Sequence, residues 1–104
     1  MPDTTGVRLQ ITPTADGLEL TGEIDAHTAP QLGEQLDPLP GDDGAVVLDV
    51  HGIEFIDSSG LRVLVEAHQR AVSGDRSLVI HRPSVAVKRL LEISGLSEHL
   101  TVTE

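Results

Sequence analysis

One run of six residues, Ala45–Val50 (Ala-Val-Val-Leu-Asp-Val), constrains the fold more than any other feature of the sequence. A nearly unbroken apolar, β-branched run predicts a central strand that is covered on both faces. Around it, apolar residues recur with either the period of two typical of strands or the longer period typical of helices. With 104 residues the chain can build one modest core, so residues 1–104 are predicted to form a single domain.

Two short strands are predicted before this run. Residues 7–11 alternate between apolar and polar side chains, and the alternation resumes at residues 18–20. The segment between them, residues 13–17, has the composition of a turn (Pro-Thr-Ala-Asp-Gly), so the two strands are expected to form a hairpin.

A short helix is predicted between the hairpin and the apolar run. Thr28 is a favourable N-cap residue, and Gln31 follows three positions later as in a capping box. Pro30 fits only in the first turn of this helix, which is expected to end before Pro38.

A longer helix is predicted to start at Ser58 and Ser59 and to end at Gly74, a natural C-terminal stop. Glu66 and Arg70, one turn apart, are expected to form an ion pair on its solvent-exposed face. Its inward face is expected to carry the apolar residues at helical spacing: Leu61, Leu64, Val65 and Val72.

The remaining elements are predicted to be a strand at Ser77–His81, a helix, and a terminal edge strand at Leu100–Thr103. The helix opens at Pro83 and ends at Gly95, which can take a left-handed conformation. Its inward residues are expected to be Val85, Ala86, Leu90 and Leu91. The order β-β-α-β-α-β-α-β predicts a compact α/β fold in which helices pack on a mixed sheet.

The charge of the chain is strongly negative and unevenly distributed. The net charge is −10, and residues 1–60 hold twelve acidic side chains against one basic side chain, Arg8. Such a surface repels nucleic acid and would steer a protein partner with a basic face, although acidity for solubility alone explains the charge equally well. The sequence has no cysteine, no bilayer-length apolar run and no secretion signal at Met1-Pro2-Asp3, so we expect no membrane segment and a chain compatible with the cytosol.

The segment 55–61 (Phe-Ile-Asp-Ser-Ser-Gly-Leu) places two hydroxyls at the predicted start of the longer helix. The first turn of a helix offers unpaired N–H groups and the positive end of the helix dipole, so a phosphate there would meet an anion site. Ser58 is therefore a candidate phosphoacceptor. The competing interpretation is that Ser58 only caps the helix, alone or together with Asp57 or Ser59.

Three stretches of the sequence resemble one family. Residues 57–61 (Asp-Ser-Ser-Gly-Leu) are similar to the phosphorylation motif of anti-sigma factor antagonists, which are single STAS domains. Residues 21–25 (Thr-Gly-Glu-Ile-Asp), followed by Thr28 and Ala29, and residues 87–96 (Val-Lys-Arg-Leu-Leu-Glu-Ile-Ser-Gly-Leu) match in the same order. The resemblance therefore covers almost the whole chain and implies the STAS fold.

The resemblance implies a cytoplasmic regulator of bacterial transcription, in stress response or sporulation, that is not an enzyme and contacts no DNA. In that family the unphosphorylated antagonist binds an anti-sigma factor, which is also a serine kinase, and so frees the sigma factor. The kinase then phosphorylates the serine that corresponds to Ser58, and a metal-dependent serine phosphatase reverses the reaction. The nucleotide and the metal belong to these partners, so no cofactor or metal is expected on this chain, which we expect to be a monomer or a weak homodimer.

The expected partner-binding residues lie around the acceptor. Glu23 and Asp25 are expected to pair with basic residues of the kinase. Gly60 is expected to keep the helix start slim so that the kinase cleft can approach Ser58. The full expected set is Glu23, Asp25, Thr28, Asp57, Ser59, Gly60 and Leu61.

Two departures from the family pattern concern other parts of the chain. The family commonly has a further helix after the last strand, whereas this sequence ends at Glu104, so the core is expected to be partly open there or covered by a partner. The loop from Pro38 to Gly44 is proline-rich and acidic, which indicates a different partner contact.

Two other functions remain open from the sequence. The first is a non-switching STAS accessory subunit of a membrane transporter. The second is a hydrolase built on Ser58. This function is disfavoured, because the sequence lacks a Gly-x-Ser-x-Gly elbow.

The histidines give no sign of a metal site. His68 is expected to be a partly buried ring with its hydrogen bonds satisfied. The five histidines (His27, His51, His68, His81 and His99) lack the paired spacing of a zinc site.

Overall fold

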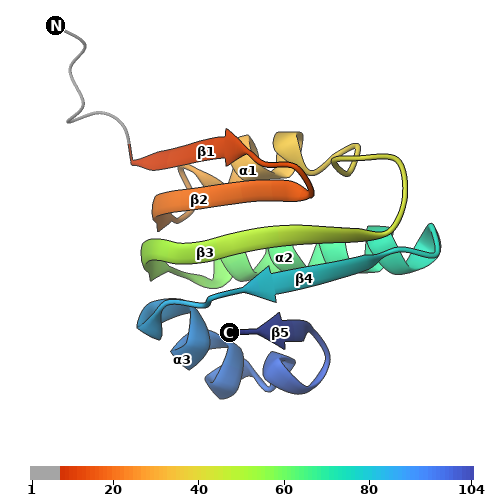
Figure 1. Ribbon diagram of the computed structural model, residues 1–104. Helices are drawn as coiled ribbons and strands as arrows, with labels where there is room; N and C mark the ends of the chain where they lie inside the picture. The colour runs from red at the N-terminus through yellow and green to blue at the C-terminus, as the bar shows by residue number, and fades with distance from the viewer. Residues whose placement is uncertain (1–7) are drawn as a thin grey trace, which may run out of the picture.

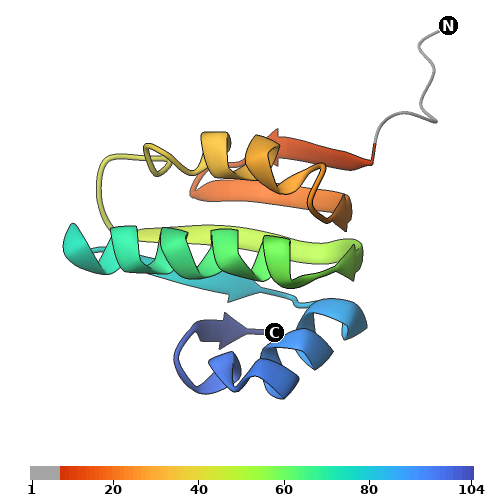
Figure 2. The same cartoon turned by 180° about the vertical axis from the view of Figure 1, so that it is seen from behind.

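The computed structural model describes residues 8–104, which form a five-stranded sheet with helices α1 and α2 laid over one of its faces (Figures 1 and 2). The elements in chain order are β1 Leu9–Pro13, β2 Gly17–Ile24, α1 Ala29–Gln35, β3 Ala45–Ile56, α2 Ser58–Ser73, β4 Ser77–His81, α3 Val85–Ser94, the 3-10 turn η2 Leu96–Glu98 and β5 Thr101–Thr103. The predicted order of strands and helices is confirmed. Val7, which the first predicted strand included, lies outside the described residues.

The strands lie in the sheet in the order in which they occur along the chain. β1 is antiparallel to β2, and the pairs β2–β3, β3–β4 and β4–β5 are parallel. Each parallel pair needs a right-handed crossover, and because every crossover moves in the same direction across the sheet, the connecting helices belong on one face.

The strand that begins with the apolar run is longer than predicted and is covered on one face only. Within β3, Val46, Leu48 and Val50 are buried, whereas Val47 and Asp49 on the other face are only half-buried. The expectation of a strand covered on both faces is therefore wrong. Helices α1 and α2 lie behind the sheet in Figure 1, and no helix of the described chain covers the face in front. Val47 alternates along β3 with the buried Val46 and Leu48, so its side chain points to that uncovered face.

The second half of β3 positions the functional residues. β4 pairs with β3 only from Ala45 to Asp49, whereas β2 pairs with β3 as far as Ile56. Residues 50–56 therefore extend past the end of β4. Helix α3 contacts β3 and lies near this end of the strand (Figures 1 and 2). Because Ile24 pairs with Ile56, the connections that follow β2 and β3 leave the sheet side by side.

The buried faces of the helices differ from the predicted faces at their ends. In α2 the buried residues are Gly60, Leu64, Ala67 and Ala71, whereas Val72 is exposed. Val72 lies eight residues after Leu64, a rotation of about 80° from it on an α-helix, which turns it away from the sheet. In α3 the buried residues are Val87 and Leu91, and Val85, two residues before Val87, points to the opposite side and is exposed.

The exposed ion pair predicted on α2 is also wrong. Glu66 lies 3.9 Å from the Nε of Arg62, one turn before it. Arg70 instead donates to the carbonyl oxygen of Leu36 at 2.9 Å, and so joins α2 to the end of α1.

The predicted ends of the helices are confirmed: α1 ends before Pro38, and Gly95 takes a left-handed conformation with a φ of 79°. No helix of the described chain is long and apolar enough to cross a membrane.

Candidate functional site

The Ser58 hydroxyl is exposed on the first residue of α2, and Asp57 is the residue that caps this helix. The Asp57 carboxylate accepts hydrogen bonds from the backbone N–H groups of Ser59 at 2.9 Å and Gly60 at 3.3 Å. Within residues 8–104 the Ser58 hydroxyl has no hydrogen-bond partner. Of the two interpretations left open by the sequence, capping by Ser58 is therefore wrong, and among the described residues nothing engages its hydroxyl oxygen.

The predicted anion site at this helix end is already occupied. A carboxylate at the N-cap satisfies N–H groups that an incoming phosphate would need, and it brings its own negative charge to the positive end of the dipole. The expectation that a phosphate on Ser58 would meet unpaired N–H groups is wrong at Ser59 and Gly60, because Asp57 binds both.

The neighbouring β2–α1 connection is held together by buried polar contacts. Asp25 is buried, and one of its carboxylate oxygens accepts from the backbone N–H groups of His27 at 2.9 Å and Thr28 at 3.1 Å. Its other oxygen pairs with the guanidinium of Arg8, which also lies 3.2 Å from the carboxylate of Glu23. Asp25 is therefore engaged within the chain, while the side chain of Glu23, also paired with Arg8, is 42% exposed.

The predicted capping box at α1 is wrong. Thr28 precedes the helix, but its hydroxyl accepts from the backbone N–H of Asp25 and donates to the carbonyl oxygen of Glu23, both at 2.9 Å. The Gln31 amide reaches the carbonyl oxygen of Leu9 at 3.4 Å instead of the start of the helix. The threonine hydroxyl therefore ties the end of β2 to α1 and leaves the helix without a side-chain cap.

Gly60 has a different role from the one predicted. It is buried, and a Cβ at this position would lie 2.6 Å from Cγ2 of Ile24 and 2.8 Å from Cγ1 of Ile56. The missing side chain lets α2 start close to the ends of β2 and β3, so it serves inward packing and not the approach of a partner. Leu61 is partly buried against the same core.

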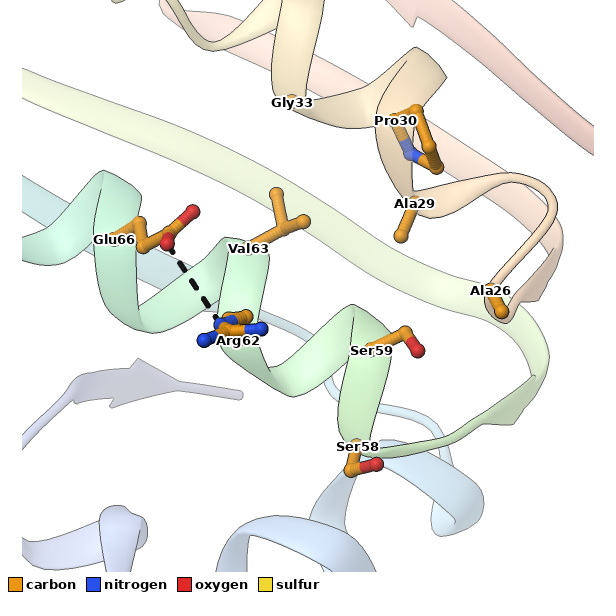
Figure 3. Close-up of a pocket in the computed structure, with 9 residues that line it drawn as sticks. All are labelled: Ala26, Ala29, Pro30, Gly33, Ser58, Ser59, Arg62, Val63 and Glu66. Atoms are coloured by element: carbon orange, nitrogen blue, oxygen red, sulfur yellow. Dashed lines mark ion pairs between the residues drawn. The ribbon is translucent and has the colours of Figure 1, made fainter.

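A cavity of about 600 Å³ lies between α1 and α2, and Ser58 and Ser59 stand at one end of it (Figure 3). Its remaining walls come from the β2–α1 connection and from both helices: Ala26, Ala29, Pro30, Gly33, Arg62, Val63 and Glu66. Arg62 is not among the site residues expected from the sequence, although its position four residues after Ser58 places both on the same side of a helix. We call residues 23–28 and 57–61, which meet here, the Ser58 corner.

A second polar cluster lies on the uncovered face of the sheet. Ligand atoms of Glu19, Asp49 and His51 lie within 4.8 Å of one another, but the guanidinium of Arg82 already contacts Asp49 at 2.6 and 3.1 Å. Burial alone would raise the pKa of Asp49, but hydrogen bonds from His51 and Arg82 outweigh it and lower that pKa from 3.8 to about 2. Arg82 therefore supplies the cation of this cluster.

The expectation of a satisfied ring at His68 is wrong at one atom. His68 is half-buried on α2, and its Nδ1 atom is buried without a hydrogen-bond partner in the described part of the chain.

Comparison with known proteins agrees with this architecture. The family model described as "Mlab, STAS domain" matches residues 7–103. The anti-sigma-B factor antagonist of Listeria monocytogenes is 36% identical over 84 residues, which are 80% of this chain and 74% of that protein. The anti-sigma-B factor antagonist of Staphylococcus aureus is 31% identical over 88 residues, 84% of this chain and 82% of that protein.

Among solved structures, the anti-sigma factor antagonist SpoIIAA in its unphosphorylated form superposes with a TM-score of 0.70 at 18% identity. The superposition covers 92% of this chain and 88% of that one. This similarity concerns the fold, whereas the two curated relatives carry the assignment further, because both exceed 30% identity over most of their own length. Together with the family model, they show that this chain belongs to the STAS-domain family of anti-sigma factor antagonists.

Proposed function

We propose that this chain is the antagonist of an anti-sigma factor that is also a serine kinase, and that phosphorylation of Ser58 ends their association. Binding of the unphosphorylated chain frees the sigma factor, and a serine phosphatase restores the binding form. The observation that carries the proposal is the free, exposed hydroxyl of Ser58 at a corner built from two connections. The proposed cycle takes place in the cytoplasm, in a single domain that binds no nucleic acid.

The phosphorylation step needs little from this chain beyond an accessible oxygen. Oγ of Ser58 forms a bond to the γ-phosphorus of ATP, the bond from that phosphorus to ADP breaks, and the hydroxyl proton passes to a base of the kinase. The product carries about −1.5 to −2 extra charge and three strong acceptor oxygens. A docked partner would meet both added bulk and added repulsion at the corner.

The proposed partner-binding residues fall into two groups. Glu23, Ser59 and Leu61 reach at least partly to the surface near Ser58 and are proposed to contact the kinase. Asp25, Thr28, Asp57 and Gly60 are proposed to act through the shape of the corner, because their atoms are engaged in contacts within the chain. Removing a residue of the first group should weaken binding and leave folding intact, whereas removing one of the second group should affect both.

Binding of two variants to the anti-sigma factor encoded in the same genome tests the switch. Ser58→Asp is expected to weaken the complex at least tenfold, and Ser58→Ala is expected to bind as tightly as the wild type and to persist when ATP is added. Ser73→Asp, at the other exposed end of α2, is the control for an added negative charge. Mass spectrometry after incubation with kinase and ATP should place the phosphate on Ser58 and not on Ser59.

Two results would contradict the proposal. If Ser58→Asp bound as tightly as the wild type, the charge at the corner would not control association. If the wild-type chain held its partner equally with and without ATP and gained no phosphate, the non-switching transporter subunit would become the better description.

A further inference from the structure

We propose that Arg62 is the internal ligand of the phosphate on Ser58, and that it leaves Glu66 to bind this phosphate. The inference rests on the proposed function, in which Ser58 is phosphorylated. Ser58 and Arg62 line the same cavity from α2 (Figure 3). They lie four residues apart on one helix, the spacing at which side chains meet.

A phosphate on Ser58 needs a donor from outside the helix end. Asp57 already binds the N–H groups of Ser59 and Gly60, and its own carboxylate lies beside the modified residue. The usual stabilisation of an anion by free N–H groups in the first helical turn is therefore reduced here, and a like charge is added. A nearby cation gains correspondingly in importance.

Arg62 is available for this contact. Its side chain is 81% exposed, and its one described ion pair is to the exposed carboxylate of Glu66 at 3.9 Å. An exposed pair at this distance is weak, whereas a guanidinium can bind a phosphate through two parallel N–H···O bonds. The competition between the two anions therefore favours the phosphate.

The other basic side chain of α2 that follows Ser58 cannot substitute for Arg62. Arg70 lies twelve residues after Ser58, about 18 Å along the helix. It is also bonded to the carbonyl oxygen of Leu36, the residue that follows the last turn of α1.

The exchange would change the cavity as well as the corner. When Arg62 turns towards residue 58, Glu66 loses its partner and its carboxylate becomes the unpaired charge on the cavity wall. A partner that contacts both Ser58 and Glu66 would then meet two altered sites after a single phosphorylation.

The test uses full-length chains in which phosphoserine is placed at position 58 by genetic code expansion, and follows the second pKa of the phosphate by phosphorus NMR. Arg62→Gln is expected to raise this pKa by roughly 0.3 to 0.7, because the dianion loses its cation. Glu66→Gln is expected to lower it, because Arg62 is freed from its competitor. Arg70→Gln removes the same charge about 18 Å away, beyond the Debye length at physiological salt, and is expected to have much less effect.

Equal pKa values in the Arg62→Gln and Arg70→Gln proteins would overturn the inference, and so would an unchanged value in Glu66→Gln. Because Arg62 is exposed, its replacement should leave the circular dichroism melting curve of the unphosphorylated chain unchanged. No kinase takes part in this titration. It therefore fails or succeeds independently of the binding experiment that tests the proposed function.

Discussion

The two strand-to-helix connections of the Ser58 corner use polar side chains in opposite ways. After β2, the carboxylate of Asp25 and the hydroxyl of Thr28 are buried and bonded to the chain itself. After β3, Asp57 takes the capping role and leaves the Ser58 hydroxyl exposed. One connection is thus held rigid by its own polar contacts, whereas the other presents a hydroxyl at the surface, where we propose that it is phosphorylated. We call them the rigid and the reactive connection.

The largest expected effect comes from the rigid connection. Asp25→Ala should lower the free energy of unfolding by about 3 kcal/mol, because the buried N–H group of Thr28, the part-buried N–H group of His27 and the guanidinium of Arg8 lose their acceptor. Urea denaturation measures this loss. A loss no larger than that of Asp57→Ala would show that the two connections do not differ in rigidity.

The next effect tests how closely the reactive connection is packed on the sheet. Gly60→Ala should destabilise the fold by about 2 kcal/mol, because the new Cβ would lie within 3 Å of side-chain atoms of Ile24 and Ile56. Gly33→Ala is the matched control: it lies in α1 with open space at its Cβ, so the change should be neutral or stabilising. Thermal unfolding of the two variants measures the difference. Equal melting temperatures for Gly60→Ala and Gly33→Ala would contradict the close packing of Gly60 on the sheet.

An ionic network outside both connections serves as a reference for the comparison. The pKa of Asp49 lies near 2, below its usual 3.8, so its stabilisation is complete above about pH 4 and is lost as the pH falls through 2. Because its partners His51 and Arg82 are about half exposed, solvent screening leaves only part of that shift as stability, on the order of 1 kcal/mol. In Asp49→Asn the free energy of unfolding should therefore fall less steeply between pH 4 and 2 than in the wild type. Asp42→Asn, in the exposed loop, should not change this slope.

The smallest effects on stability are expected in the reactive connection itself. Asp57→Ala should cost about 1 kcal/mol, the usual value for a lost N-cap. Ser58→Ala should stay within about 0.5 kcal/mol of the wild type, because the hydroxyl has no described partner. A clearly larger loss for Ser58→Ala would mean that this oxygen is a structural group, which would erase the contrast between the two connections.

Much of the fold could be predicted because its signals are local. The alternation at residues 18–20, Pro30 in the first turn of α1 and Gly95 after α3 each act within a few residues, and the structure places them as expected. The one-sided burial of β3 could not be found this way, because Val47 has an apolar side chain on a face that only the topology leaves open.

The candidate site could likewise be predicted only where its signals are local. Ser58 as a candidate acceptor and Asp57 as a possible cap could be predicted from the sequence, since both lie at a helix start. It could not assign the engagement of Asp25 with Arg8, seventeen residues earlier in the chain, or the inward packing of Gly60 on Ile24. These contacts join segments that are distant in sequence and depend on the register of β2 against β3.

The overhang of β3 beyond β4 has a consequence for experiment. From residue 50 to residue 56 the strand has a ladder neighbour on the β2 side only, among the elements described. Backbone amides on its other edge lack a sheet partner and should exchange with deuterated water sooner than those of residues 45–49. Protection confined to this stretch when a partner is added would locate the docking surface without any substitution in the chain.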